Sequence, residues 1–296
     1  MAARRETVLI TGASVGLGLA IARELLAKTD HHLILTAREA SMGRFAEVGL
    51  HESERIWLRP LDIVHPGQRE DVVAEIEARF GALDVLINNA GVMYRSVVEH
   101  VEADELRAQM RVNFLAPMAL TRRVLPAMRA RRRGRVLFIS SVGGMMAMPT
   151  MAAYSASKFA LEGAAEALWY EVRPWGIRVS LIEPGFIQSD GFTKVRLTRQ
   201  SSASADDVND AYHQHYASME PFVANIMRRT PATPGSVARS VRRTMTARCP
   251  SLRVEATWDA WVFSLLRRWV PRCFYHRLLY WRLPNVKTWG RDGRPS

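Results

Sequence analysis

Cysteine is almost absent from this chain, and so are the patterns typical of secreted, metal-dependent and membrane-spanning proteins. The only cysteines among 296 residues, Cys249 and Cys273, are too few for a disulfide framework and suit a reducing cytoplasm. No compact cluster of histidine, cysteine and carboxylate residues has zinc-site spacing, so we expect no metal. No apolar run approaches the ~18 residues of a membrane span, and the N-terminus carries no secretory signal. We therefore expect a cytoplasmic protein.

Acidic residues are also scarce relative to basic ones. The chain has 41 Lys and Arg against 29 Asp and Glu, a formal net charge of +12. Such a charge brings nucleic acid into consideration as a partner. However, the densest basic run, 129–135, contains no aromatic residues for base stacking, and it ends a predicted helix, where cations interact favourably with the helix dipole. We therefore expect no nucleic-acid partner.

Apolar strands alternate with amphipathic helices along most of the chain. Buried strands are predicted at 7–10, 33–37, 55–58, 84–87, 136–139 and 176–182. This alternation predicts an α/β fold, a doubly wound parallel sheet of the Rossmann type. The length suits one catalytic domain over 1–250, followed by an amphipathic helical extension over 251–296.

A glycine-rich turn joins the first strand to the first helix. The residues of this turn that we expect to contact a dinucleotide are Gly12, Ser14, Val15, Gly16, Leu17 and Gly18. Gly12 permits a tight turn, Gly16 lets a pyrophosphate approach the backbone, and Gly18 lets the helix pack on the strand. The free amides at the start of the helix then face the phosphates. The segment therefore predicts a dinucleotide site.

The second strand ends at Arg38, which bears on the choice of dinucleotide. An acidic residue here would bond the ribose 2′-hydroxyl of NAD, whereas an arginine accommodates the 2′-phosphate of NADP. Ala37 occupies the expected acidic position, and Ser14 offers a further hydroxyl. The alternative is a solvated arginine that opens a loop. We expect NADP(H).

Tyr154 and Lys158 lie four residues apart, so they leave the same face of a predicted helix. A cation in that position stabilises phenolate and lowers the pKa of the tyrosine. Ser141 follows a predicted buried strand, and open α/β sheets bind ligands at the carboxyl ends of their strands. The alternative is that Ser140 and Ser141 only begin a turn. The three residues together predict a site for acid–base chemistry.

With these motifs the chain resembles the short-chain dehydrogenase/reductase family, in its standard-length branch and its steroid- and retinoid-type members. The resemblance runs from about Thr7 to Ser189. Further residues that carry it are Asp62, Ile63, Asn89, Ala90, Gly91, Asn113, Pro184, Gly185, Ile187 and Ser189. Ser189 stands where the family more often has threonine, and it keeps the hydroxyl.

The resemblance implies the roles of these residues. NADPH would carry the hydride, and Tyr154 would protonate the developing alkoxide in reduction or act as base in oxidation. Lys158 would lower the pKa of Tyr154 and hold the nicotinamide ribose, Ser141 would stabilise the carbonyl oxygen, and Asn113 would hold a water. Asp62 with Ile63 would contact the adenine, the segment 89–91 would close the cofactor cleft, and the loop 184–189 would lie beside the nicotinamide. Homo-oligomers are common among relatives, so we expect one here.

Two segments outside these motifs bear on the substrate. Residues 190–230 are expected to be an insertion that covers it. The extension carries aromatic residues at helical spacing among arginines, and the stripe consists of Trp258, Trp261, Val262, Leu265, Trp269, Phe274, Tyr275, Leu278, Leu279 and Trp281. Either 255–283 contacts a membrane surface, or this stripe packs on the enzyme or on a partner subunit. Both interpretations favour a lipophilic substrate such as a sterol, a retinoid or a long-chain acyl carbonyl.

The sequence thus predicts an NADP(H)-dependent oxidoreductase that interconverts a carbonyl and an alcohol on a lipophilic small molecule. The alternative is a non-catalytic dinucleotide-binding sensor or scaffold protein on the same fold. Such a protein would be free to lose the catalytic side chains, yet all four are present: Asn113, Ser141, Tyr154 and Lys158.

Overall fold

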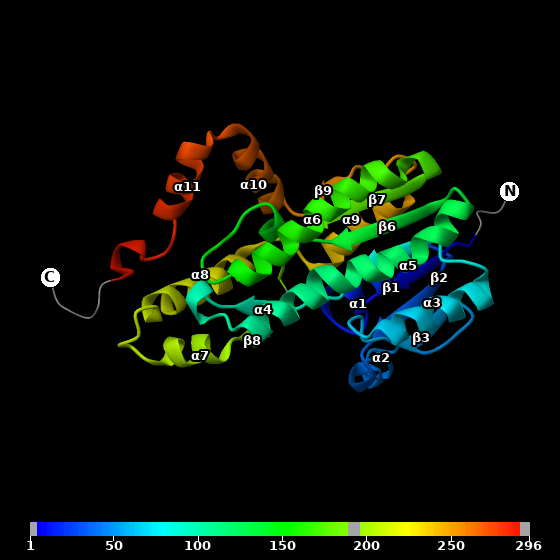
Figure 1. Ribbon diagram of the computed structural model, residues 1–296, viewed down its shortest axis with the longest axis horizontal. Helices are drawn as coiled ribbons and strands as arrows, with labels where there is room; N and C mark the ends of the chain where they lie inside the picture. The colour runs from blue at the N-terminus through cyan, green and yellow to red at the C-terminus, as the bar shows by residue number, and fades with distance from the viewer. Residues whose placement is uncertain (1–4, 189–195, 291–296) are drawn as a thin grey trace.

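The computed structural model describes residues 5–188 and 196–290, apart from the side chain of Arg272. Its centre is a seven-stranded parallel sheet in the order β3-β2-β1-β4-β6-β7-β9 (Figure 1). The strands are β1 (Thr7–Ile10), β2 (His32–Ala37), β3 (Ile56–Pro60), β4 (Val85–Asn88), β6 (Gly134–Ile139), β7 (Ile177–Glu183) and β9 (Arg253–Glu255). The predicted doubly wound Rossmann-type sheet is confirmed.

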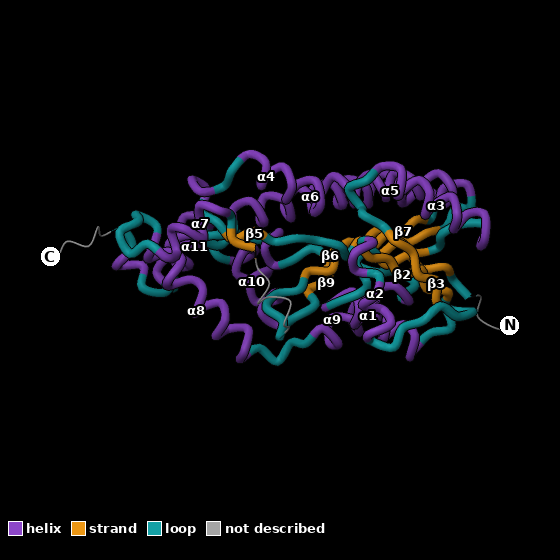
Figure 2. The backbone as a smooth tube through the Cα atoms, turned by 90° about the horizontal axis from the view of Figure 1, so that it is seen from below, coloured by secondary structure: helices purple, strands orange, loops and turns teal. Residues whose placement is uncertain are grey.

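Helices cover both faces of the sheet (Figure 2), so the strands are buried on both sides. One face packs against α3 (Pro66–Phe80), α5 (Ala116–Ala130) and α6 (Ala152–Val172). The other packs against α1 (Gly16–Lys28), α2 (Gly43–Glu47) and α9 (Pro234–Thr246). Adjacent strand residues alternate between the two apolar layers: Leu9 contributes to the first, and Val8 and Ile10 to the second.

The strand order reverses direction between β1 and β4, which are hydrogen-bonded neighbours. From β1 the chain builds outward through β2 and β3 on one side, then crosses to β4, β6, β7 and β9 on the other. Ligands of doubly wound sheets bind at this switch point, outside the carboxyl ends of the strands. The topology therefore fixes where a site belongs.

One long helical run carries Asn113 across the sheet. It consists of α4 (Ala103–Met110), a π-helical turn (Arg111–Leu115) and α5. The sequence predicted continuous helix over this stretch and gave no sign of the π turn. In such a turn the backbone hydrogen bonds span five residues instead of four, and π turns often occur at functional sites.

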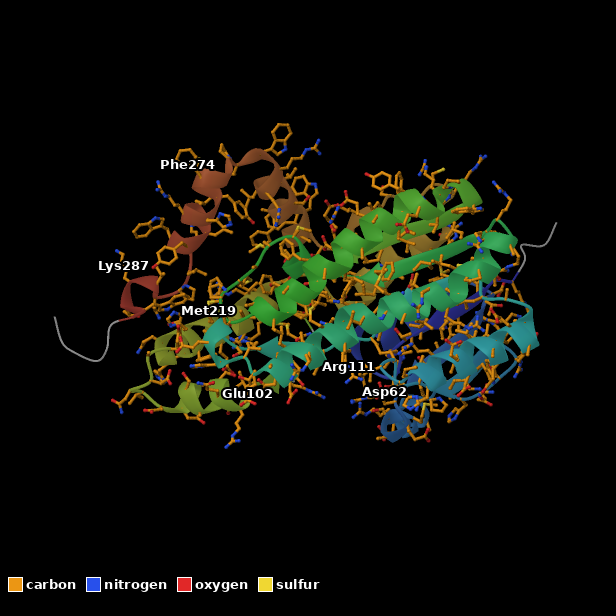
Figure 3. All side chains as sticks on the ribbon, viewed as in Figure 1. Asp62, Glu102, Arg111, Met219, Phe274 and Lys287 are labelled. Atoms are coloured by element: carbon orange, nitrogen blue, oxygen red, sulfur yellow. The ribbon has the colours of Figure 1, made fainter. Side chains whose placement is uncertain are left out.

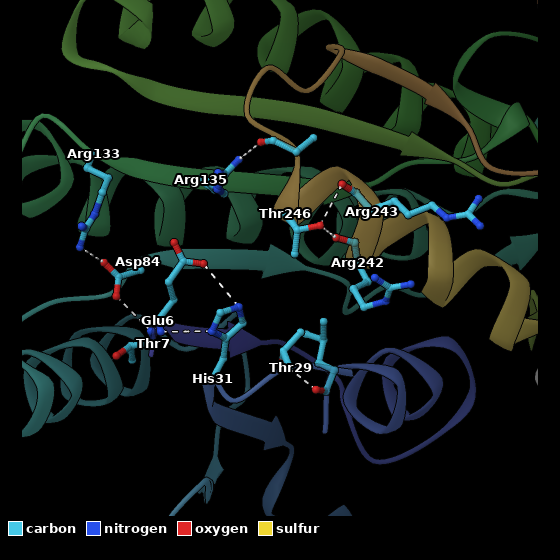
Figure 4. A network of polar contacts seen from close by, with 12 residues as sticks. Glu6, Thr7, Thr29, His31, Asp84, Arg133, Arg135, Arg242, Arg243 and Thr246 are labelled. Carbon is cyan, nitrogen blue, oxygen red and sulfur yellow. Dashed lines mark hydrogen bonds and ion pairs between the residues drawn. The ribbon is translucent and has the colours of Figure 1, made fainter. Parts of the chain in front are cut away.

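The basic run 129–135 contains two arginines that neutralise a buried acid. Asp84, only 2% exposed, accepts a hydrogen bond from Arg131 Nη1 at 3.0 Å. It also accepts from Arg133 Nη2 at 2.8 Å and from the backbone N–H of Thr7 at 3.0 Å (Figure 4). A buried carboxylate requires such partners. Part of this basic run therefore stabilises the amino end of the sheet, where we had expected only a solvated helix end.

A second group of elements extends from the carboxyl end of the sheet (Figure 1). The short strand β5 (Tyr94–Arg95) pairs in parallel with β8 (Arg196–Leu197), which leads into α7 (Arg199–Asp206) and α8 (His213–Arg229). The polar run 201–207 is largely α7. Its Ser201 is buried and donates from Oγ to the Arg95 carbonyl at 3.0 Å.

The C-terminal segment first completes the sheet and then leaves it. β9 pairs with β7, so the sheet continues past residue 250 and the first helix of the extension begins at Trp258. That helix is α10 (Trp258–Trp269), and α11 (Arg272–Trp281) follows. Across the described parts of the chain, no helix combines the length and apolarity needed to cross a bilayer.

Candidate active site

Most of the predicted site residues gather at one edge of the sheet because they follow the carboxyl ends of its strands. The glycine turn follows β1, Arg38 follows β2, Asp62 lies just beyond β3, and the segment 89–91 follows β4. Ser141 lies just beyond β6, and Pro184 follows β7. Ser189 lies outside the described residues.

The glycine turn fits a dinucleotide because side chains at its glycines would collide with the backbone or fill the approach to it. A Cβ at Gly18 would overlap the carbonyl oxygen of Gly12, and one at Gly12 would come within 3.0 Å of the Ala90 Cα. Gly16 has a φ of +57° and nothing within 4 Å of its Cβ position, so its backbone is open to a ligand. No side chain caps the start of α1, which leaves its first amides available to phosphate oxygens.

Asn89 and Thr11 hold the glycine turn against the loop after β4. Asn89 donates from Nδ2 to the carbonyls of Thr11 at 2.9 Å and Gly12 at 3.0 Å. In return, Thr11 Oγ1 accepts from the backbone N–H groups of Asn89 and Ala90, both at 3.0 Å. These four bonds rigidify the two backbone segments that would flank a dinucleotide.

The residues expected around the adenosine end differ in exposure. Arg38 is exposed directly after β2, and Ser14, at the glycine turn, is 4% exposed. Asp62 is half-buried and accepts from the Val64 N–H at 3.1 Å. Ile63 packs into the core beside α3, so its side chain serves folding.

Tyr154 and Ser141 meet at the carboxyl end of β6. Ser141 caps a short turn, where its Oγ accepts from the Gly143 N–H at 3.1 Å. The Tyr154 ring lies over that turn, and a Cβ at Gly143 would come within 2.9 Å of Tyr154 Cε1. Burial raises the pKa of Tyr154, and a hydrogen bond with Ser141 partly offsets this rise. The phenol is therefore held in its protonated form at neutral pH.

Lys158 is buried one turn along α6. Its Nζ donates to the Ile139 carbonyl at 2.8 Å and lies 5.9 Å from the centroid of the Tyr154 ring. Burial lowers the pKa of Lys158 to about 8, against an opposing effect of the Glu162 carboxylate. In this geometry the expected lowering of the Tyr154 pKa by Lys158 does not outweigh the effect of burial. The ammonium is turned toward a carbonyl, and burial of the phenol dominates.

Asn113 is fully buried and braces the site from the π turn. Its Oδ1 accepts from the Val92 N–H at 2.9 Å, and its Nδ2 donates to the Val92 carbonyl at 2.9 Å and to Ser157 Oγ at 3.1 Å. It thereby joins the loop after β4 to α6 at Ser157, which lies between Tyr154 and Lys158 in the sequence. The structure thus brings Asn113 to the catalytic group, with its amide occupied by protein partners.

Behind the site, the sequence did not predict a charge network in which an exposed arginine pairs with two buried carboxylates. Arg253 Nη1, on β9, contacts Glu162 Oε2 at 2.5 Å and Glu183 Oε1 at 2.7 Å. Glu162 also accepts from Ser140 Oγ at 2.6 Å. Burial raises the pKa of Glu183 to about 7, with a further rise from Glu162 and an opposing effect of Arg253. One signal was available in the sequence: Glu162 stands one helical turn after Lys158.

The start of α10 is hydrogen-bonded to the loop after β7. The sequence did not predict this contact either. Gly185 N–H donates to Thr257 Oγ1 at 2.8 Å, and Phe186 N–H donates to Asp259 Oδ2 at 2.8 Å. A Cβ at Gly185 would overlap the Asp259 carboxylate. The position of the loop expected beside a nicotinamide therefore depends on the extension.

Comparisons with known proteins agree with this arrangement. Residues 6–200 match the family model of the short chain dehydrogenases. A 3-ketodihydrosphingosine reductase of Bacteroides thetaiotaomicron is 36% identical over 207 residues, which make up 70% of this chain and 73% of the relative. A 3-dehydrosphinganine reductase of Danio rerio is 33% identical over 202 residues, 65% of this chain and 59% of the relative.

Solved structures show the same fold. A short-chain dehydrogenase from Streptomyces avermitilis superposes with a TM-score of 0.77 at 30% identity, covering 95% of this chain and 97% of the other. A metagenomic short-chain oxidoreductase in complex with NADP has a TM-score of 0.62 at 26% identity, covering 84% and 96%. The chain belongs to the short-chain dehydrogenase/reductase family, which confirms the predicted resemblance.

Proposed function

We propose that this protein is an NADP(H)-dependent oxidoreductase that interconverts a carbonyl and an alcohol on a lipophilic small molecule. The observation that carries the proposal is the contact of Tyr154 with Ser141, beside Lys158, at the sheet edge that also holds the glycine turn. The NADP complex of the similar metagenomic oxidoreductase supports the choice of cofactor.

The residues present fit NADP(H). The open backbone at Gly16 and the uncapped start of α1 would hold the pyrophosphate, and Arg38 with Ser14 would hold the 2′-phosphate. Pro184, Gly185 and Ile187 would lie beside the nicotinamide, with Ser189 as a further contact. When bound, this cofactor supplies or accepts the hydride.

The proton chemistry falls to the protein's own side chains. Tyr154, whose pKa lies above its ordinary value, carries its proton at neutral pH, as a donor to the developing alkoxide must. Ser141 Oγ donates a hydrogen bond to the carbonyl oxygen as charge develops there. Lys158 supplies a buried cation next to Tyr154, and Asn113 fixes α6 so that both side chains keep their positions.

A lipophilic substrate is supported by the apolar side chains that cover the site. Val142, Met145 and Met146 follow Ser141 directly and form a cluster with Met148. Phe186 clusters with methionines of α8, Met219 and Met227. Methionine adapts its shape to irregular apolar partners, as a lipid chain would require. The two sphingoid-base reductases among the relatives are consistent with a long-chain ketone as substrate.

Conversion of Tyr154 to phenylalanine tests this function. Tyr154→Phe should retain NADPH binding, measured by NADPH fluorescence, and lose at least 100-fold in NADPH consumption with long-chain, steroid and retinoid ketones. The matched control is Tyr170→Phe, at an exposed tyrosine of the same helix, which should keep full activity.

Full activity of Tyr154→Phe would show that another group supplies the proton. NADPH binding by the wild type without turnover of any carbonyl would favour the non-catalytic sensor or scaffold.

A further inference from the structure

The two helices of the extension have an inner face that covers the catalytic segment. Phe263 of α10 and Leu279 of α11 pack against Val142, Met145 and Met146, the residues that follow Ser141. Leu283, just beyond α11, joins the cluster of Phe186 with α8. Through Thr257 and Asp259, the start of α10 is also bonded to the loop after β7. The extension is therefore a fixed part of the site wall.

The outer face of the same helices is aromatic and exposed. On α10, Trp258, Trp261 and Trp269 recur at helical spacing and are 73%, 50% and 73% exposed. On α11, Phe274, Leu278 and Trp281 recur likewise and are 61%, 41% and 66% exposed. Figure 3 shows Phe274 on the rim of the extension, pointing away from the body of the protein. The predicted stripe is therefore divided: Tyr275 and Leu279 are turned toward the protein, whereas its tryptophans are exposed.

The charge around this face has one sign. From residue 260 to residue 291 the sequence contains no aspartate or glutamate, and its lysines and arginines are Arg267, Arg268, Arg272, Arg277, Arg282, Lys287 and Arg291. Where the structure describes their side chains, Arg267, Arg268, Arg277, Arg282 and Lys287 are exposed. A contiguous patch of exposed aromatic side chains is uncommon on the surface of a soluble monomer and usually marks an interaction site.

The charge decides between two occupants of the face. A second copy would meet it through the same surface in a two-fold dimer, which would bring like charges together. An anionic bilayer would accept the tryptophans, Phe274 and Leu278 at its interface and would pair its phosphates with the arginines. The face therefore suits a lipid surface better than a second copy.

We propose that the outer face of α10 and α11, defined by Trp258, Trp261, Trp269, Phe274, Leu278 and Trp281, docks on an anionic lipid bilayer. This inference rests on the proposed function, since a membrane is where an enzyme of lipophilic carbonyls would meet its substrate. The inner face then holds the catalytic segment directly beneath the docked surface.

The two exposed cysteines provide a site-specific test. Cys273 lies on α11 within the proposed face, whereas Cys249 follows α9 at the opposite, amino end of the sheet. An environment-sensitive fluorophore would be attached to Cys273 in a Cys249→Ser variant, and to Cys249 in a Cys273→Ser variant. Vesicles of phosphatidylcholine with phosphatidylglycerol should shift the emission of the Cys273 label to the blue and leave the Cys249 label unchanged.

Co-sedimentation of the full chain with the same vesicles measures affinity. The triple variant Trp261→Ser, Trp269→Ser, Phe274→Ser should bind at least tenfold more weakly than wild type, and Tyr170→Ser, at an exposed aromatic residue of α6, should bind normally. Binding should fall with added salt and on pure phosphatidylcholine. NADPH fluorescence of each preparation reports both folding and the proposed function.

The outcomes separate the two proposals. A wild type that binds NADPH but not the vesicles overturns docking and leaves the function standing. A wild type that binds the vesicles but not NADPH overturns the proposed function and leaves docking standing. If the triple variant changes a dimer into a monomer while vesicle binding is unaltered, the face is a subunit interface and docking is overturned.

Discussion

The buried carboxyl group of Glu183 beside Arg253 makes stability depend on pH in a direction opposite to that of most acidic residues. Glu183 is 1% exposed, and burial raises its pKa to about 7 in the folded protein, against an ordinary value of 4.5. Between these two values the folded state keeps a proton that the unfolded state has lost. Stability must therefore fall as pH rises from about 4.5 to about 7.

The magnitude follows from that pKa difference. A difference of about 2.5 pKa units, from 4.5 to about 7, corresponds to about 3.5 kcal/mol in full at 25 °C, since each unit is worth about 1.4 kcal/mol, and most of it falls between pH 4 and pH 8. Glu183→Gln keeps the shape of the side chain and removes the titration. The free energy of unfolding of wild type minus that of Glu183→Gln should therefore decrease by about 3 kcal/mol between pH 4 and pH 8.

Urea unfolding at four or five pH values across that range measures this difference. The matched control is Glu166→Gln, which removes a 44%-exposed carboxylate that contacts the same guanidinium at 3.0 Å. Because water solvates Glu166, this variant should follow the wild-type profile. Parallel profiles for wild type and Glu183→Gln would refute the assignment of a raised pKa to Glu183.

Two further substitutions test the cofactor site and the sheet. Arg38→Ala should raise the Kd for NADPH about tenfold, the value of one charge-assisted phosphate contact, and leave the Kd for NADH unchanged; an equal effect on both dinucleotides would remove Arg38 from the 2′-phosphate site. Asp84→Ala should lower the free energy of unfolding by about 2–4 kcal/mol, because it removes three hydrogen bonds to a buried carboxylate, whereas Asp104→Ala, at an exposed ion pair, should change it by less than about 0.5 kcal/mol. A small effect of Asp84→Ala in urea unfolding would mean that Arg131 and Arg133 do not stabilise the fold through this acid.

The sequence predicted those parts of the site whose signal is local. The glycine turn ends eight residues after its strand, and Tyr154 and Lys158 are one helical turn apart, so short spacing was enough to place them. The fold followed from the alternation of strands and helices. Ser141 was placed by the buried strand before it, and Asn113 and the loop after β7 by resemblance. The structure brings all three to the same edge of the sheet.

Contacts between distant parts of the chain could not be predicted. Arg253 reaches Glu162 and Glu183 across separations of 91 and 70 residues, and no periodic pattern encodes such a pairing. The direction of the Tyr154 pKa shift depends on burial and on where the Lys158 ammonium points, which spacing alone leaves undetermined. For α10, hydropathy identified the aromatic stripe correctly but did not tell whether it faces the protein or the solvent.

The late position of β9 in the sequence has a consequence for how the protein is made. A ribosome releases β7 about 70 residues before Arg253, and until then two acidic groups destined for the interior lack their counter-charge. The last strand and the helices behind it emerge almost together. A nascent chain therefore acquires the cover over Ser141 and the aromatic outer face of α10 and α11 only after β9 has been made.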